Sequence, residues 1–128
     1  MENDITVLIL EDEDAIRESL AAYLEDFGIS TLKPADANEA RKMCELREPA
    51  VAIVDLRLPG AGGDTFIQEV HDRCPGTRFI LYTGSPREEI PSELFGLPWV
   101  SPNVFFKPVF DLKLIYDEVM RCAGETRG

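Results

Sequence analysis

The chain has 128 residues, a formal net charge of −11 and an apolar content of 45%. That length corresponds to one domain with a sizeable core, and the composition is that of a globular rather than a disordered chain. Such an acidic protein repels phosphate backbones and anionic lipids, so we expect no direct binding to nucleic acid or to membranes. No apolar run approaches the roughly 20 residues that span a bilayer, and residues 1–4 lack the basic start of a signal peptide, which predicts a cytoplasmic location.

Four short apolar runs are predicted to form buried strands, and each is followed by polar residues. The runs cover residues 5–10, 51–54, 79–82 and 104–106. Continuous apolar runs without alternation are typical of parallel strands that helices cover on both faces. The polar residues that follow them are Glu11, Asp12, Asp55, Thr83 and Lys107. Because ligands of such sheets bind at the carboxyl ends of the strands, we expect these five side chains to share one crevice.

Helical periodicity appears between the strands. Apolar residues predict a helix from about Asp14 to Phe27 with Gly28 as its C-terminal cap, and residues 29–33 follow as a short strand.

A second helix is predicted to open with a capping box at Asp36 and Glu39 and to end before Pro49. Two more helices are predicted from apolar stripes. The stripes are Phe66, Ile67 and Val70, and Leu112, Ile115, Val119 and Cys122.

The segment of residues 85–103 has weaker signals. Ser85 and Glu88 have capping-box spacing around a proline, which predicts a helix start, but Pro91 interrupts the helix that would follow. A proline inside a helix costs roughly 3 kcal/mol, so we expect this helix to be short, shifted or largely irregular.

The alternation of strands and helices predicts a doubly wound α/β fold with a five-stranded parallel sheet and a short or irregular fourth helix. We expect one domain over residues 1–128, with its core at about 4–123 and a loose tail at 124–128.

The cysteines predict no special chemistry. Cys44, Cys74 and Cys122 are odd in number and scattered, so we expect small apolar core residues rather than disulfides. His71 could share a helix face with Cys74, but two candidate ligands do not make a zinc site. We expect a surface histidine.

The polar residues at the strand ends predict phosphoryl-transfer chemistry. Two carboxylates about 4 Å apart repel by roughly 4 kcal/mol at an effective dielectric of 20, so Glu11, Asp12 and Asp55 favour a divalent cation. Magnesium prefers such an all-oxygen set to the sulfur and imidazole ligands of zinc. Asp55 could then attack phosphorus, Thr83 could donate to a phosphoryl oxygen, and Lys107 could supply positive charge.

These residues resemble the receiver domains of two-component response regulators over nearly the whole chain. Four groups carry the resemblance in family order: Glu11 and Asp12; Asp55 with Leu58, Pro59 and Gly63; Thr83 and Gly84; and Phe106, Lys107 and Pro108. The resemblance implies a flavodoxin-like (βα)5 sandwich that takes a phosphoryl group from the phosphohistidine of a histidine kinase or a histidine phosphotransfer protein.

The resemblance also implies a role for each site residue. Asp55 would be the phospho-acceptor, Asp12 a direct magnesium ligand, and Glu11 a ligand acting mainly through water. The backbone carbonyl of Arg57 would be the remaining protein ligand. The switch hydroxyl and the phosphoryl-sensing ammonium would be Thr83 and Lys107.

The same family predicts a cis peptide between Lys107 and Pro108. The chain departs from the family pattern in two places, and one of them is the proline-broken segment of residues 85–103, where the family has its fourth helix. Val104 stands three residues before the lysine, where the family often has an aromatic switch residue, and Phe105 or Tyr82 could substitute.

Our interpretation is a stand-alone phosphorylation-dependent switch or relay that signals to a downstream protein and is not a metabolic enzyme. The main alternative is a degenerate receiver that binds partners without phosphorylation. The aspartate-nucleophile phosphatases have a second aspartate two residues after the nucleophile. This chain has Arg57 at that position, which disfavours a phosphatase. A flavin-binding domain would need a phosphate-cradling loop where Glu11 and Asp12 would repel the phosphate.

Overall fold

The fold is a five-stranded parallel sheet in the order β2-β1-β3-β4-β5, seen in a computed structural model that describes residues 4–57 and 62–127, with side chains up to 124. The strands are β1 (Thr6–Leu10), β2 (Ser30–Leu32), β3 (Val51–Val54), β4 (Arg78–Thr83) and β5 (Phe105–Phe106). The helices are α1 (Asp14–Glu25), α2 (Ala37–Arg47), α3 (Gly63–Arg73) and α4 (Leu112–Arg127), with short 3-10 helices η1 (Arg87–Glu89) and η2 (Ser92–Gly96). The predicted doubly wound fold is confirmed, since this strand order is the flavodoxin-like one.

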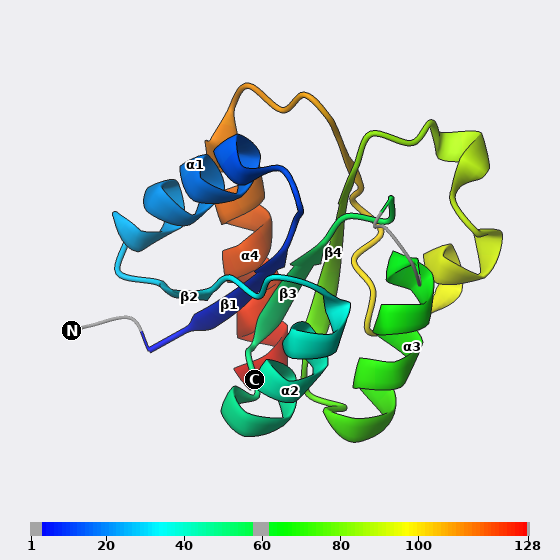
Figure 1. The fold of residues 1–128 in the computed structure, drawn as a ribbon, viewed down its shortest axis with the longest axis horizontal. Helices are drawn as coiled ribbons and strands as arrows, with labels where there is room; N and C mark the ends of the chain where they lie inside the picture. The colour runs from blue at the N-terminus through cyan, green and yellow to red at the C-terminus, as the bar shows by residue number, and fades with distance from the viewer. Residues whose placement is uncertain (1–3, 58–61, 128) are drawn as a thin grey trace.

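Helices cover both faces of the sheet (Figure 1). Helices α1 and α4 lie together on one face, and α2 and α3 lie on the other. Each face has its own apolar cluster, and the strands contribute alternate residues to the two. The strands are therefore buried on both sides, which explains why their sequences read as continuous apolar runs. No helix among the described residues is both long and apolar enough to span a membrane.

The helix boundaries follow the sequence signals with two differences. Gly28 has a φ of 83°, in the left-handed region where glycine is favoured, and Asp36 accepts a hydrogen bond from the backbone N–H of Glu39, 2.8 Å away. Helix α1 ends at Glu25 rather than at Phe27. Helix α4 continues to Arg127, so the loose tail that we expected from residue 124 onward is wrong for the backbone of residues 124–127.

The 85–103 segment contains the two 3-10 helices and an isolated bridge from Val100 to Phe79 of β4 but no α-helix, so the expected irregularity is confirmed. The capping box at Ser85 is wrong. Pro86 is the residue before η1 and makes no side-chain cap, while Ser85 is buried and donates its backbone N–H to the hydroxyl oxygen of Thr83. Pro91 separates η1 from η2, as the cost of a proline inside a helix predicts.

Side chains attach this segment to the rest of the fold. The guanidinium of Arg87 lies 5.1 Å from the ring centre of Phe95 and 5.7 Å from that of Phe106, within range of cation–π attraction. Trp99 stacks on His71 of α3 with ring centres 3.5 Å apart. The surface histidine that we expected is therefore half-buried against an aromatic ring.

The cysteines are buried and free, as the sequence predicts. The thiol of Cys74 donates to the backbone carbonyl of Cys44, 3.3 Å away, between α2 and α3. Burial raises the pKa of the Cys44 thiol to about 12, so it stays protonated at neutral pH. The three cysteines are therefore core residues with unreactive thiols.

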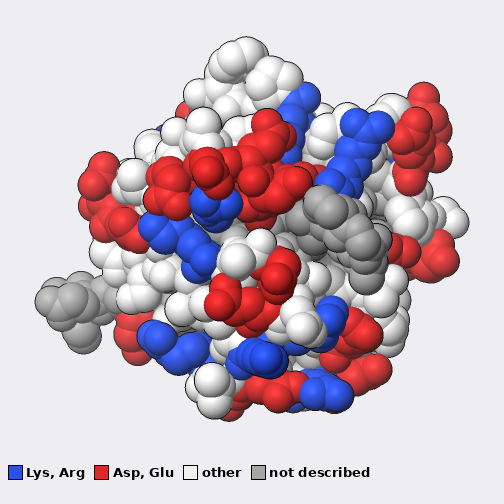
Figure 2. Space-filling view, viewed as in Figure 1, with Lys and Arg blue, Asp and Glu red and all other residues white. Residues whose placement is uncertain are grey.

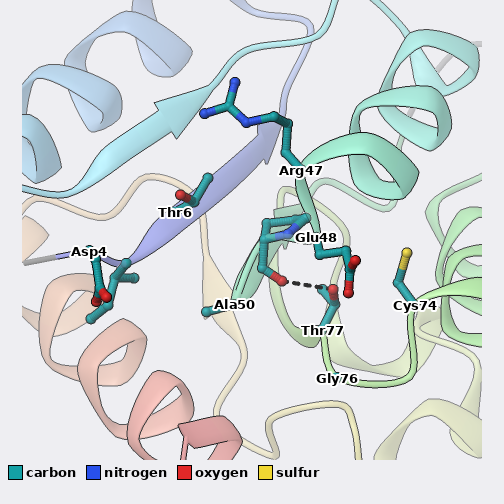
Figure 3. Close-up of a pocket in the computed structure, with 10 residues that line it drawn as sticks. Asp4, Thr6, Arg47, Glu48, Ala50, Cys74, Gly76 and Thr77 are labelled. Atoms are coloured by element: carbon teal, nitrogen blue, oxygen red, sulfur yellow. Dashed lines mark hydrogen bonds between the residues drawn. The ribbon is translucent and has the colours of Figure 1, made fainter.

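A hollow of about 340 Å³ lies at the amino ends of the strands (Figure 3). Thr77 closes one wall by donating its hydroxyl to the carbonyl of Pro49, 2.8 Å away. Arg47, Glu48 and Asp4 bring charges of both signs to its lining. This hollow is at the opposite end of the sheet from the strand-end residues of the predicted site.

A polar cluster joins the chain before β5 to α4. Glu118 is buried and accepts hydrogen bonds from the hydroxyl of Ser101, from the guanidinium of Arg121 and from the amide of Asn103. Burial alone would raise the pKa of Glu118, but the bonds from Arg121 and Ser101 outweigh it and lower that pKa. The carboxylate therefore stabilises the folded chain.

We expect Glu118→Gln to lower the free energy of unfolding at pH 7 by about 1 kcal/mol, because the charged acceptor is lost. A lowered folded pKa contributes stability above the unfolded pKa, and that contribution disappears as the pH falls through the folded pKa. Urea denaturation at pH 7 and at pH 3 should therefore show a difference that shrinks in acid. Glu93→Gln, at an exposed position, is the control; a difference independent of pH would contradict the assignment.

Candidate functional site

The strand register brings the predicted site residues together at the carboxyl edge of the sheet. Leu10 of β1 pairs with Val54 of β3, so the residues that follow these strands, Glu11 and Asp55, are neighbours. The backbone N–H of Asp55 extends this ladder by donating to the carbonyl of Leu10, 3.1 Å away. The site lies next to the β1–β3 crossover, the topological switch point at which ligands of such folds bind.

Strand β5 brings the lysine to the same edge. Thr83 pairs with Phe106, and the backbone N–H of Lys107 donates to the carbonyl of Thr83, 2.9 Å away. The ammonium of Lys107 lies 3.0 Å from Oδ2 of Asp55 and 2.5 Å from Oε1 of Glu11. The peptide between Lys107 and Pro108 is cis, as the family resemblance predicts.

The site couples a half-buried cation to buried carboxylates. Side-chain exposure is 12% for Lys107, 2% for Glu11 and 5% for Asp55. Burial alone would lower the pKa of Lys107, but the two carboxylates outweigh it and raise that pKa. Burial raises the pKa of Glu11, partly offset by the ammonium. Lys107 is therefore a permanent positive charge beside Asp55 at neutral pH.

Three carboxylates form a set that could hold a cation. One ligand oxygen from each of Glu11, Asp12 and Asp55 lies within 4.8 Å of the others. Oε1 of Glu11 is buried and accepts no hydrogen bond of standard geometry, although the charge of Lys107 lies beside it. An all-oxygen set with a buried, incompletely satisfied acceptor fits a hard divalent cation such as magnesium.

The surroundings of this set are acidic. Figure 2 shows acidic side chains gathered over α1 and the turn before it, where Asp12, Glu13, Asp14 and Glu18 are exposed. Such a surface attracts cations and basic partner surfaces.

Two small residues shape the rim. The hydroxyl of buried Thr83 accepts a hydrogen bond from the N–H of Ser85 at 3.1 Å, which orients it at the end of β4. Gly63 begins α3 directly beside the backbone that follows β3. A Cβ at this position would lie 2.8 Å from the carbonyl oxygen of Asp55, which is too close for any side chain. Glycine is therefore required at that position. Leu58 and Pro59, which also carried the resemblance, lie outside the described residues.

Sequence reasoning missed two side chains at this site. Glu13 places Oε1 3.5 Å from the ammonium of Lys107, and its position in the acidic run after β1 could have revealed it. We considered only the backbone carbonyl of Arg57, but its backbone N–H donates to Oδ1 of Asp55 at 2.9 Å and its side chain pairs with Glu89. No sequence signal indicated that pairing.

The aromatic residues near Val104 divide between the two faces of the sheet. Tyr82 and Phe105 pack with α1 and α4, and the ammonium of Lys107 lies 5.5 Å from the ring centre of Tyr82. Val104 and Phe106 pack on the other face, where Phe106 contacts Arg87 of η1. Phe106, which we had not considered as a substitute for the aromatic switch residue, therefore lies on the same face of the sheet as Val104 and contacts η1.

Comparison with known proteins identifies the family and agrees with the fold. The family described as response regulator receiver domain matches residues 7–98. Transcriptional regulatory protein CssR of Bacillus subtilis is 31% identical over 110 residues, which cover 86% of this chain and 48% of that protein. The chain belongs to the response regulator receiver domain family of two-component signal transduction. It spans about half the length of CssR.

Solved receiver structures share the fold. A CheY-like receiver domain protein of Methanospirillum hungatei JF-1 superposes with a TM-score of 0.85 at 24% identity over 98% of both chains. Response regulator protein TrrA of Thermotoga maritima, solved in complex with Mg(2+)-BeF, superposes with a TM-score of 0.78 at 20% identity over 92% of this chain and 98% of that one.

Proposed function

We propose that this chain accepts a phosphoryl group on Asp55 from the phosphohistidine of a histidine kinase or a histidine phosphotransfer protein. An oxygen of the Asp55 carboxylate would form the new bond to phosphorus while the bond from phosphorus to the imidazole nitrogen breaks. The observation that carries this proposal is the buried Asp55 carboxylate held 3.0 Å from the ammonium of Lys107. A carboxylate at a charge-stabilised site is a suitable nucleophile for phosphoryl transfer.

Magnesium is the proposed cofactor. Asp12 and Asp55 would hold it directly, Glu11 mainly through water, and Arg57 through its backbone carbonyl. When bound, the ion would neutralise charge on the phosphoryl oxygens and so lower the barrier to transfer. The crystal structure of the structural neighbour TrrA in complex with Mg(2+)-BeF supports this choice of ion.

The remaining side chains would sense the product. Lys107 would stay beside the phosphoryl group as a charge partner, and Thr83 would turn its hydroxyl from the N–H of Ser85 toward a phosphoryl oxygen. A phosphoryl group adds about −1.5 to −2 charge and three acceptor oxygens, which is enough to bias a two-state surface. The chain would then act as a switch or relay and not as a metabolic enzyme.

The proposed output is contact with a downstream protein. The net charge of −11 and the exposed acids over α1 favour a partner with a basic face and disfavour DNA or a membrane. We also propose the cytoplasmic location that the sequence predicts. Mass spectrometry after incubation with acetyl phosphate and magnesium tests the function. One added phosphoryl group would support it, whereas none would indicate a degenerate receiver.

We expect phosphorylation to change residues 85–103 more than any other part. Thr83 precedes this segment and Lys107 closely follows it, so attraction of both toward the phosphoryl group pulls on its two ends. Its short 3-10 helices have few backbone hydrogen bonds, which places it at the low-stability end of the fold. Amide hydrogen exchange with magnesium, before and after beryllofluoride is added, measures this change. Changes confined to the loops after Leu10 and Asp55 would contradict it.

A further inference from the structure

Arg57 lies just after β3, and its side chain extends toward the segment of residues 85–103. It follows Asp55 by two residues, and its backbone is fixed by the bond to Oδ1 of that carboxylate. Its side chain lies beside Gly84, where a Cβ would be 4.0 Å from Nη1 of the guanidinium. The other terminal nitrogen, Nη2, lies 3.7 Å from Oε1 of Glu89 in η1. One side chain therefore links the end of β3 to the first turn of the segment.

This ion pair is weak enough to be exchanged. The side chains of Arg57 and Glu89 are 60% and 57% exposed, and exposed pairs of this kind are screened by solvent and salt. At 3.7 Å the contact is longer than a charge-assisted hydrogen bond. A nearby group with more charge and more acceptor oxygens would compete for the guanidinium.

The other cations near the site have partners of their own. Lys107 is half-buried and pairs with Glu11 and Asp55, and Arg87 lies against the rings of Phe95 and Phe106. A phosphoryl group carries about −1.5 to −2 charge, compared with the single charge of Glu89. The planar guanidinium can donate two parallel hydrogen bonds to such an oxyanion.

We propose that phosphorylation of Asp55 draws the Arg57 guanidinium from Glu89 to the phosphoryl oxygens. The inference rests on the proposed function. In it, the Arg57 side chain transmits phosphorylation to η1 by exchanging its partner Glu89 for the phosphoryl group. Loss of the pair releases Glu89 and removes a link between η1 and β3. This route needs no aromatic switch residue, which matters because position 104 is a valine.

The test is a double-mutant cycle on beryllofluoride affinity at saturating magnesium, measured by isothermal titration calorimetry. We expect Arg57→Gln to weaken binding about three- to tenfold, which is less than the usual effect of removing a charge-assisted hydrogen bond because this side chain is exposed to solvent and salt. Glu89→Gln should strengthen binding about two- to threefold, because the guanidinium no longer has a competing partner. In the Arg57→Gln background, the same Glu89→Gln change should have almost no effect.

The non-additivity separates exchange from general electrostatics. If Glu89 acts only as a distant negative charge, its removal should strengthen binding equally in both backgrounds, and this outcome would overturn the proposal. Arg47→Gln, which removes the same charge at the opposite end of the sheet, is the control and should leave affinity nearly unchanged. A loss of affinity in Arg47→Gln equal to that in Arg57→Gln would likewise overturn it.

The melting temperatures of the variants and beryllofluoride binding by the native chain are also measured. Melting temperatures without beryllofluoride should be similar for all variants, because an exposed pair contributes little to stability. A large loss for Arg57→Gln would mean that the side chain is structural and would overturn the proposal. If the native chain does not bind beryllofluoride at all, the proposed function itself fails; if it binds with additive mutational effects, only the exchange fails.

Discussion

Replacing Asp55 by asparagine should abolish phosphorylation of the chain by acetyl phosphate. The native protein should gain one phosphoryl group when magnesium is present and none when the metal is chelated. Asparagine has nearly the same shape but an amide that is a far weaker nucleophile than a carboxylate, so the loss should be complete within detection. Intact-protein mass spectrometry over a time course measures the labelled fraction directly.

The matched control for this loss is Asp72→Asn. It makes the same chemical change at an exposed carboxylate of α3, and it should leave labelling at the native level. A melting curve for Asp55→Asn would show that the variant remains folded. If Asp55→Asn were labelled to the same extent as the native protein, the acceptor would be another residue.

Magnesium should stabilise the protein substantially. A ligand present at a hundred times its dissociation constant adds about 2.7 kcal/mol, which for a domain of this size is on the order of 10 °C in melting temperature. Asp12→Ala should remove most of the response, because its exposed carboxylate is the one member of the set that pairs with no cation among the described residues. Glu11→Ala should remove less, since Glu11 is already paired with Lys107.

Differential scanning calorimetry after dialysis against a chelator provides the measurement. Asp72→Ala serves as the control and should keep the full magnesium response. An unchanged melting temperature of the native protein at millimolar magnesium would count against a metal site in this crevice. A similar loss of response in the Asp72 variant would show that the ion acts through general charge screening.

The fold could be predicted largely because its strands are buried on both faces. Continuous apolar runs such as residues 51–54 leave little choice but a central parallel strand, and the capping box at Asp36 acts locally. The box at Ser85 failed because the residue is buried and a local bond from its N–H to the hydroxyl of Thr83, two residues earlier, holds it outside the helix start. Composition also could not show that α4 would continue past residue 123, since helix ends depend on local backbone geometry.

The sequence predicted which residues meet at the strand ends, but it did not predict the contacts of the exposed side chains around them. Parallel register forces Glu11 and Asp55 together regardless of what surrounds them. The direction of an exposed side chain depends on loops far apart in sequence. Arg57 and Glu89 are separated by a whole helix and strand, and no local pattern connects them. Strand ends therefore predict which residues meet at the centre of the candidate site, but they do not predict the contacts of exposed side chains around it.

The stack of Trp99 on His71 gives the protein an intrinsic tryptophan fluorescence signal that reports on one contact. The chain has one tryptophan and one histidine, and they face each other between α3 and the chain that leads to β5. Any rearrangement that lifts this chain from α3 must separate the rings and change the solvent around the indole. The colour and intensity of the intrinsic emission thus follow one contact, without a dye or an introduced residue, and in stopped flow they give its rate.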